Sequence, residues 1–371
     1  MTEKLVDLLR RRIASTGPLT TADFMAEALG HADHGYYMTR DPLGVAGDFI
    51  TAPEISQMFG ELIGLWCAEI WRSNLAPRPA RLVELGPGRG TLMVDALRAA
   101  RMMPGFAEAL TVRLVETSPP LQAMQQRALA GCGVEWHRSL AEVPDGPLLL
   151  VANEFFDALP VRQFALTQEG WRERMVALDA AGERLRFTLA SERPAADTVI
   201  PREIRAVARP GDIAETCPAG LLLAADIGRR IARHGGAALI IDYGHAVSAP
   251  GETLQAVRAH QRCDPLDAPG EADITAHVDF AALSRAAASA GAVAHGPVPQ
   301  GHFLSRLGIA ERAERLRRSA TPGQARDVEA ACHRLIADEE MGTLFKALAI
   351  TPPVTPAPPG FTTLTEDSAT P

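Results

Sequence analysis

The chain has 371 residues, 47% hydrophobic and 22% charged, which suits one large α/β domain with additions or two joined domains. Its net charge of -8 and its lack of a long Lys/Arg tract argue against nucleic acid as a partner. No apolar run is long enough to span a membrane, so we expect no membrane insertion.

The cysteines and the N-terminus bear on the compartment. Five scattered cysteines without a CxxC pair argue against a disulfide framework or a zinc site and favour a reducing environment. The N-terminal segment MTEKLVDLLRRRIASTG has no apolar core of a secretory signal, and its acidic residues count against a transit peptide. We therefore expect a cytoplasmic protein.

Residues 1–78 are predicted to form a helical region with a lid. LVDLLRRRIA and TADFMAEALG have helical spacing, and each is followed by or ends on a glycine. The segment 31–53 is rich in glycine, aromatic residues and aspartate, and a loop this long usually covers or binds something. A further helix is expected from about Glu54 to Trp71.

From Ala80 onward, short apolar runs alternate with helical stretches. RLVEL, LTVRLVE, VEWHR and PLLLVANE read as strands, separated by helices such as TLMVDALRAA and PPLQAMQQRAL. This alternation is typical of βαβ units, so we predict an α/β fold with a Rossmann-like parallel sheet. Residues 161–190 alternate with period two around Glu-Gly and Ala-Gly turns, which predicts an antiparallel meander inserted after the fourth parallel strand.

The remaining chain is expected to resume the α/β pattern. We predict helices near 219–233 and 279–290 and strands at AALIIDYG and AVAHG. Further helices are expected over about 304–340, followed by a short strand, LFKALAI. The proline-rich segment TPPVTPAPPG is predicted to be disordered or at most extended.

Three glycines follow the first strand of this pattern in LVELGPGRGTL. Gly86, Gly88 and Gly90 allow a sharp turn and a close approach of the backbone to a ligand, although a tight turn without a ligand would look similar. A dinucleotide-binding turn uses G-x-G-x-x-G aimed at a pyrophosphate, whereas here every second residue is glycine. Glu84 before the turn suits a cation better than a phosphate. S-adenosylmethionine carries a sulfonium and an amino group but no phosphate, and is the predicted cofactor.

A second acid, Glu116, ends the next strand, where a carboxylate can accept hydrogen bonds from ribose hydroxyls. A dinucleotide would use such a residue as well, so Glu116 supports a nucleoside without choosing between the two. Glu84 and Glu116 could also simply cap or salt-bridge neighbouring loops.

The segment VANEFFDALPVRQF brings Asn153, Glu154 and Asp157 to the carboxyl end of the fourth strand, the edge where α/β sheets bind ligands. Charges beside two phenylalanines are costly unless a cation pairs with them. We predict that Glu154 and Asp157 hold a guanidinium or an amine and align one nitrogen with a methyl donor, without a metal. Alternatively, Asp157 caps a turn and Glu154 pairs with Arg162.

Together these segments resemble the MidA-like family of S-adenosylmethionine-dependent methyltransferases, over nearly the whole chain. The most specific stretches are HGYYMTRDPLGVAGDFITAPEISQMFGELIGLW at 34–66, NEFFDALPVRQF at 153–164 and DITAHVDFAAL at 273–283. The resemblance implies a class I methyltransferase domain over 79–371, with a β insertion near 161–215 and a helical addition near 304–340. Because the family's mitochondrial members are arginine methyltransferases for respiratory complex I assembly, it implies a protein arginine N-methyltransferase acting on a complex I subunit.

The resemblance also implies roles for individual residues. Glutamate 154 falls where arginine methyltransferases place the first glutamate of their substrate clamp, and His277 becomes a third catalytic candidate, although it could merely satisfy a buried backbone group. Asp48 could reach the methionine end of the cofactor. The cofactor-binding set is then Glu84, Gly86, Gly88, Gly90, Glu116, Asp48 and Asn153. Because His31 and His34 have no third ligand at a plausible spacing, no metal is expected.

Other functions stay open at this point. A nicotinamide-dependent oxidoreductase is disfavoured by the glycine spacing alone. An assembly factor could bind the cofactor without catalysis. A small molecule could be the acceptor, because the loop at 31–53 and the meander at 161–190 could roof a closed pocket.

Overall fold

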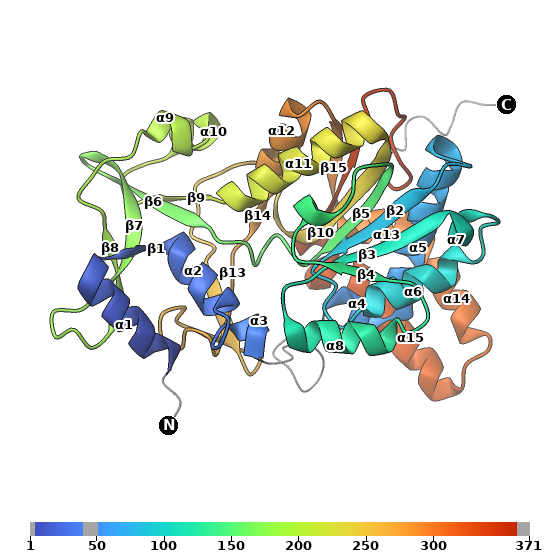
Figure 1. Cartoon of the computed structure of the whole chain (residues 1–371), viewed down its shortest axis with the longest axis horizontal. Coiled ribbons are helices and arrows are strands. Elements are labelled where there is room, and N and C mark those ends of the chain that lie inside the picture. The colour runs from blue at the N-terminus through green and yellow to red at the C-terminus, as the bar shows by residue number, and fades with distance from the viewer. Residues whose placement is uncertain (1–3, 40–50, 362–371) are drawn as a thin grey trace.

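The structure, a computed structural model, describes residues 4–39 and 51–361. Its centre is an eight-stranded sheet in the order β15-β16-β10-β5-β2-β3-β4, with β14 paired to β10 (Figure 1). The strands are β2 (Ala80–Leu85), β3 (Leu110–Val115), β4 (Glu135–His137), β5 (Leu148–Asn153), β10 (Gly236–His245), β14 (Val278–Asp279), β15 (Val293–Pro299) and β16 (Phe345–Thr351). Strands β2, β3, β4, β5 and β10 are parallel, and β16 runs antiparallel to its two neighbours β10 and β15, which confirms the α/β prediction.

Helices cover both faces of this sheet, which explains why all six residues of β5 are buried. Leu149 and Val151 point into a core with α5 (Gln57–Asn74) and α6 (Thr91–Ala100). Leu148 and Leu150 point into the opposite core, formed with α11 (Pro218–His234) and α12 (Phe280–Ser289). Helix α8 (Pro119–Ala128), helix α7 (Phe106–Ala109) and a helical turn at Leu140–Glu142 complete the connections.

A second group of elements lies beside the central sheet (Figure 1). Its main sheet contains β1 (Leu19–Thr20), β6 (Arg162–Thr167), β7 (Gly170–Leu178), β8 (Leu185–Leu189) and β9 (Ile213–Thr216). A smaller sheet contains β11 (Gln255–Arg258), β12 (Gln261–Cys263) and β13 (Asp273–Thr275). The accompanying helices are α1 (Leu5–Thr16), α2 (Thr21–Gly30), α3 (Tyr36–Thr39), α9 (Ala196–Val199) and α10 (Arg202–Val207). One hydrophobic cluster joins α1, α2, β7 and β13.

The elements of residues 1–78 divide between the second group of elements and the central domain. Helices α1 and α2 have the expected positions and pack on the second group. The helix expected from Glu54 begins at Gln57, because Ser56 is extended and caps it, and the short α4 (Ala52–Ile55) precedes it. Helix α5 packs on α6 so closely that a Cβ on Gly64 would lie 2.5 Å from the Ala96 carbonyl oxygen. The domain boundary at residue 78 stays a prediction.

The inserted meander is confirmed, since β6, β7 and β8 pair antiparallel in sequence order. Strands β1 and β9 extend this sheet and were not predicted. Strand β1 has only two residues, so it carries no periodic signal. The C-terminal helices are α13 (Gln300–Arg306), α14 (Ile309–Arg317) and α15 (Pro322–Ile336), followed by a helical turn at Asp338–Gly342. None of the described helices combines the length and apolarity needed to cross a membrane.

The end of the proline-rich segment after β16 packs against the domain, so of the two expectations, disordered or extended, the second fits better. The Trp66 Nε1 donates a hydrogen bond to the Pro359 carbonyl oxygen over 3.1 Å, and Arg306 donates to the Gly360 carbonyl oxygen over 3.1 Å. The Phe361 ring packs 5.3 Å from the Phe303 ring, centroid to centroid. Residues 359–361 are therefore held by contacts with Trp66, Arg306 and Phe303, which composition alone does not reveal.

Candidate active site

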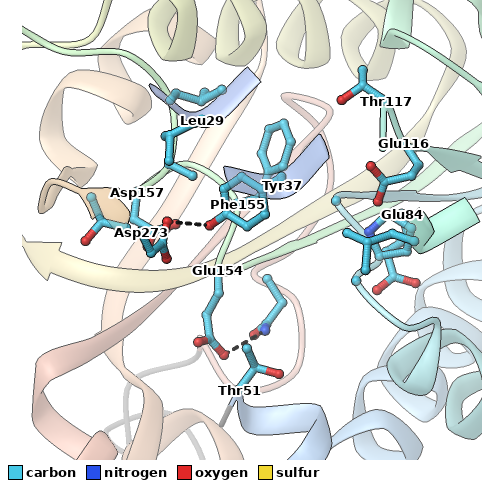
Figure 2. Close-up of a pocket in the computed structure, with 18 of the residues that line it drawn as sticks. Leu29, Tyr37, Thr51, Glu84, Glu116, Thr117, Glu154, Phe155, Asp157 and Asp273 are labelled. Carbon is cyan, nitrogen blue, oxygen red and sulfur yellow. Dashed lines mark hydrogen bonds between the residues drawn. The ribbon is translucent and has the colours of Figure 1, made fainter. Parts of the chain in front are cut away.

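A cavity of about 430 Å³ lies at the carboxyl ends of β2, β3, β5 and β10, bordered by α2, α3 and β13. Figure 2 shows Glu84, Glu116 and Thr117 at one end and Asp157 and Asp273 at the other. Of the predicted site residues that the structure describes, all except Gly90 and His277 line this cavity. Asp48 lies outside the described residues.

The glycine turn after β2 forms one wall of this cavity. Gly86, Gly88 and Gly90 have φ angles of 60°, 53° and 85°, in the left-handed region that residues with a Cβ rarely adopt. A Cβ on Gly86 would also lie only 2.7 Å from Cδ2 of Phe155. The turn is thus fixed both by its own backbone and by the ring that follows β5.

Glu84, at the end of β2, is buried, and burial together with the nearby charge of Glu116 raises its pKa to about 8. Its Oε2 atom has no hydrogen-bond partner among the described residues. A buried carboxylate oxygen without a partner is costly, so this position calls for a ligand with a cationic or N–H donor group.

Glu116, after β3, is held by hydrogen bonds. Its carboxylate accepts from the Ser118 backbone N–H over 2.7 Å and from Gln125 Nε2 over 3.1 Å, while burial raises its pKa. Gln125 also donates to the Gly88 carbonyl oxygen over 2.7 Å, so its side-chain amide connects the carboxylate of Glu116 to the glycine turn. Sequence reasoning missed Gln125, because a glutamine in PPLQAMQQRA looks like an ordinary helix-surface residue.

Glu154 directly follows β5 and has a left-handed backbone, with φ 49°. Its Oε1 accepts hydrogen bonds from the Ala52 N–H over 2.9 Å and from Asn153 Nδ2 over 3.0 Å. Burial raises its pKa to about 7, and the charge of Asp157 adds to the effect. The suggested pairing with Arg162 does not occur, since Arg162 binds Glu173 instead.

Asp157 also has a raised pKa, about 6. Burial of the carboxyl group is the main cause, and a hydrogen bond with Tyr243 opposes the rise. Its Oδ1 atom has no hydrogen-bond partner among the described residues, and neither does Oδ1 of Asn153. Both residues line the cavity. The acceptor end therefore presents oxygen atoms that need N–H donors.

Asp242 of β10 stabilises the turn that follows β5. Its Oδ2 accepts the backbone N–H groups of Phe155, Phe156 and Asp157 over 3.1, 2.9 and 3.2 Å. Burial, with the charges of Asp157 and Glu154, raises the pKa of Asp242. One carboxylate thus fixes the turn that carries both predicted acceptor residues.

Two further lining residues were not singled out from the sequence. Tyr37 of α3 donates its hydroxyl proton to Asp273 Oδ1 over 2.9 Å, and Asp273 opens β13. Both lie inside segments that carried the family resemblance, but nothing in their spacing relates α3 to β13. Arg89 also lines the cavity and lies 3.5 Å from Glu54, which accepts a hydrogen bond from the Thr91 hydroxyl.

His277 occupies a different place from the other candidates. It lines a second cavity of about 530 Å³, beside α10, α11 and α12, and does not line the first. Its ring meets the Tyr243 ring edge-on at 5.4 Å, and its backbone N–H donates to Thr253 Oγ1 over 2.9 Å. Burial and the nearby His245 lower its pKa. A catalytic role for His277 stays a prediction without support from this geometry.

Residues 62–298 match a family profile described as "Putative S-adenosyl-L-methionine-dependent methyltransferase". The chain belongs to this methyltransferase family, the MidA-like one. Among its relatives, "Protein arginine methyltransferase NDUFAF7, mitochondrial" of Mus musculus is 40% identical over 93% of this chain and 83% of that protein. The Drosophila melanogaster homologue is 38% identical over 94% and 85%.

Solved structures agree with this membership. A Burkholderia thailandensis protein with bound S-adenosyl-homocysteine has a TM-score of 0.83 and 29% identity, covering 96% of this chain and 94% of that one. A second structure from the same organism has a TM-score of 0.79, 30% identity and the same coverage. The predicted family, the Rossmann-like methyltransferase fold and the cofactor S-adenosylmethionine are confirmed.

The residues of this methyltransferase fit that cofactor. The unpartnered Glu84 Oε2 suits an amino or sulfonium group, and Glu116 lies where ribose hydroxyls can donate to it. Gly86 and Gly88 of the glycine turn line the cavity, so their backbone can approach the ligand without an intervening side chain. Asn153 also lines the cavity, and its Oδ1 atom has no hydrogen-bond partner among the described residues.

Proposed function

We propose that this methyltransferase acts on an arginine side chain of a protein, a subunit of respiratory complex I. The main observation in favour of arginine as the methyl acceptor is the acidic lining of the cavity. Its described lining contains one basic side chain, Arg89, and six carboxylates, which are Glu54, Glu84, Glu116, Glu154, Asp157 and Asp273.

Arg89 and Glu54 offset each other, which leaves five carboxylates. The cofactor brings a sulfonium, an ammonium and a carboxylate, and so adds one net positive charge. A cationic acceptor favours the ionised forms of Glu154 and Asp157, whose pKa values are raised by burial, whereas a neutral acceptor would leave that burial cost in place. The guanidinium group stays protonated at neutral pH and offers five N–H donors, which matches the unpartnered oxygens at this end.

The relatives' names support the same acceptor, since the mouse and fly proteins are named protein arginine methyltransferases. The complex I subunit follows from the family resemblance alone, with the cytoplasm as the proposed compartment.

The protein's own residues then bind and orient the acceptor. S-adenosylmethionine, when bound, supplies an electrophilic methyl group. Glu154 and Asp157 hold the guanidinium from two sides and leave one nitrogen directed toward the cofactor end, so that alignment contributes much of the rate. Asp242 keeps their turn in place. Glu154, with a pKa of about 7, accepts the proton that the methylated nitrogen releases.

The test is transfer of labelled methyl groups to proteins in a lysate from cells lacking this chain, followed by mass spectrometry of methylarginine. The wild type should label an arginine of a complex I subunit, and Glu154→Gln should slow labelling by about 10² to 10³ because a buried charge pair is broken. Glutamine keeps an oxygen for the Ala52 N–H, so cofactor affinity should stay within about threefold.

The control is Glu69→Gln, which removes a carboxylate that pairs with Arg72 at the surface of α5 and should leave labelling unchanged. A label found only in small molecules would replace the protein acceptor with a metabolite. Tight cofactor binding without any label would indicate a non-catalytic assembly factor. A labelled protein that is indifferent to Glu154→Gln would remove Glu154 from the acceptor site.

A further inference from the structure

The acceptor end of the cavity has a wall that does not come from the methyltransferase sheet. Tyr37 belongs to α3 and Asp273 to β13 of the small three-stranded sheet, and their side chains are joined by the 2.9 Å hydrogen bond. Both line the same cavity as Asp157, and Figure 2 shows Asp157 and Asp273 next to each other. Side chains from three separate parts of the chain therefore line this end of the cavity.

The hydroxyl of Tyr37 is also influenced by the charges of both carboxylates. Burial raises the pKa of the Tyr37 hydroxyl well above its ordinary value, and the charges of Asp273 and Asp157 raise it further. Asp273 is 5% exposed and Asp157 is 7% exposed, and Oδ1 of Asp157 has no hydrogen-bond partner among the described residues. Both carboxylates are therefore buried beside the same hydroxyl, at the cavity that all three residues line.

We propose that Asp273, oriented by Tyr37, is a third carboxylate of the acceptor site and determines its specificity for a guanidinium. This inference rests on the proposed function. In this arrangement Glu154 and Asp157 contact the acceptor from the loop after β5, and Asp273 contacts it from β13. A planar guanidinium spreads its N–H groups over several directions, whereas an ammonium concentrates its charge at one atom. Carboxylates on separate elements suit the planar group.

Tyr37 allows a sharp test, because two contacts hold it independently. Its backbone carbonyl oxygen accepts a hydrogen bond from Ser118 Oγ over 2.6 Å, on the Glu116 side of the cavity. Its hydroxyl bonds Asp273 on the acceptor side. Tyr37→Phe therefore removes the bond to Asp273 while the Ser118 contact keeps α3 in place.

The experiment is calorimetric titration of the full chain, saturated with S-adenosyl-homocysteine, with a synthetic arginine peptide and its lysine and citrulline counterparts. Citrulline has nearly the shape of arginine but no charge. The wild type should prefer the arginine peptide. Asp273→Asn should weaken arginine-peptide binding by about tenfold or more, and Tyr37→Phe by about threefold to tenfold, because each removes a charged or charge-orienting hydrogen bond. The preference over lysine should shrink in both.

Three measurements keep the outcomes distinct. The affinity for S-adenosyl-homocysteine should stay unchanged in both variants, and Asp267→Asn, an exposed substitution on the same segment, should bind every peptide as the wild type does. A wild type that does not prefer arginine over citrulline overturns the proposed acceptor together with this inference. A wild type that prefers arginine while both variants match it overturns this inference alone. If Asp273→Asn also loses the cofactor product, its cavity is damaged and Tyr37→Phe decides.

Discussion

Single carboxylates control the acceptor end of the site, and their protonation states should be visible in the pH profile. The pKa values of Glu154 and Asp157 are about 7 and about 6, because both groups are buried. Below these values the carboxyl groups are neutral and cannot pair with a guanidinium, which stays charged throughout.

We therefore expect kcat/KM for the protein acceptor to rise with pH through about 6 to 7 and to level off near pH 8. The measurement is initial rates between about pH 5.5 and about pH 9 at saturating cofactor. Glu154→Gln should shift the rise toward the lower pKa of Asp157, because only that group still titrates near it. A wild-type profile that falls across this range would contradict the assignment of these carboxylates to a cation.

Residues at strand ends were the predictable part of this site. The predicted residues lie at or just after the carboxyl ends of parallel strands, which meet at one edge by the geometry of the sheet; they are Glu84, Glu116, Asn153, Glu154 and Asp157. Tyr37 and Asp273 come from segments whose places depend on tertiary packing, so no spacing could join them. The part of Asp242 in binding three backbone N–H groups depends on the fold of a neighbouring turn.

At the scale of elements, the strand-to-helix turn should tolerate substitution unevenly along its length. A Cβ on Gly86 would meet the Phe155 ring at 2.7 Å, whereas a Cβ on Gly90 would meet its nearest neighbours at 3.5 Å. Both positions have positive φ, so alanine costs about 1 to 2 kcal/mol of backbone strain at each. Only Gly86→Ala must also displace the ring or the turn.

Gly86→Ala should thus weaken cofactor binding by about tenfold or more, and Gly90→Ala by only about threefold or less, in calorimetric titrations with S-adenosylmethionine. Gly182→Ala is the control for strain alone, because Gly182 has φ 74° in a hairpin turn with open space around it. It should lose stability without losing cofactor affinity. Equal cofactor affinities for Gly86→Ala and Gly90→Ala would mean that the contact with Phe155 does not shape the site.

Element boundaries show where periodicity stops being informative. The parallel strands and the meander were predictable, because buried apolar runs and period-two alternation span several residues each. Strand β1 has two residues and exists through pairing of Leu19 with Val176 of β7. Ser56 splits one expected helix into α4 and α5, which places the Ala52 N–H against Glu154. Such short features depend on distant partners rather than on local pattern.

On the scale of the whole molecule, the second group of elements, with its two sheets and helices α1 to α3, lies beside the carboxyl edge of the central sheet (Figure 1). This arrangement encloses acidic groups that the parallel sheet alone would leave in water. Enclosure without a ligand has a thermodynamic consequence, because a buried carboxyl group with a raised pKa holds its proton in the folded state longer than in the unfolded state.

Glu84 should make the stability of the ligand-free protein depend on pH. Its pKa is about 8 when folded, against an ordinary 4.5. As pH rises between these values the unfolded state loses its proton first, so the stability present below the ordinary pKa is lost progressively up to the folded pKa. The ligand-free Tm should fall between about pH 6 and about pH 8, and S-adenosylmethionine should raise Tm more at the higher pH, where its cationic groups meet an ionised Glu84.

Glu84→Gln separates this effect from other titrations. The neutral amide avoids the ionisation, so the variant should exceed the wild-type Tm by about 2 °C or more at pH 8 and by less near pH 5, while its cofactor affinity falls by about tenfold or more. Thermal unfolding with and without S-adenosylmethionine provides both readings, with Glu69→Gln as the surface control. If Tm changes with pH in the same way in Glu84→Gln and in the wild type, Glu84 does not titrate in this range and is already ionised without a ligand. Its unpartnered oxygen would then require a cation other than the cofactor.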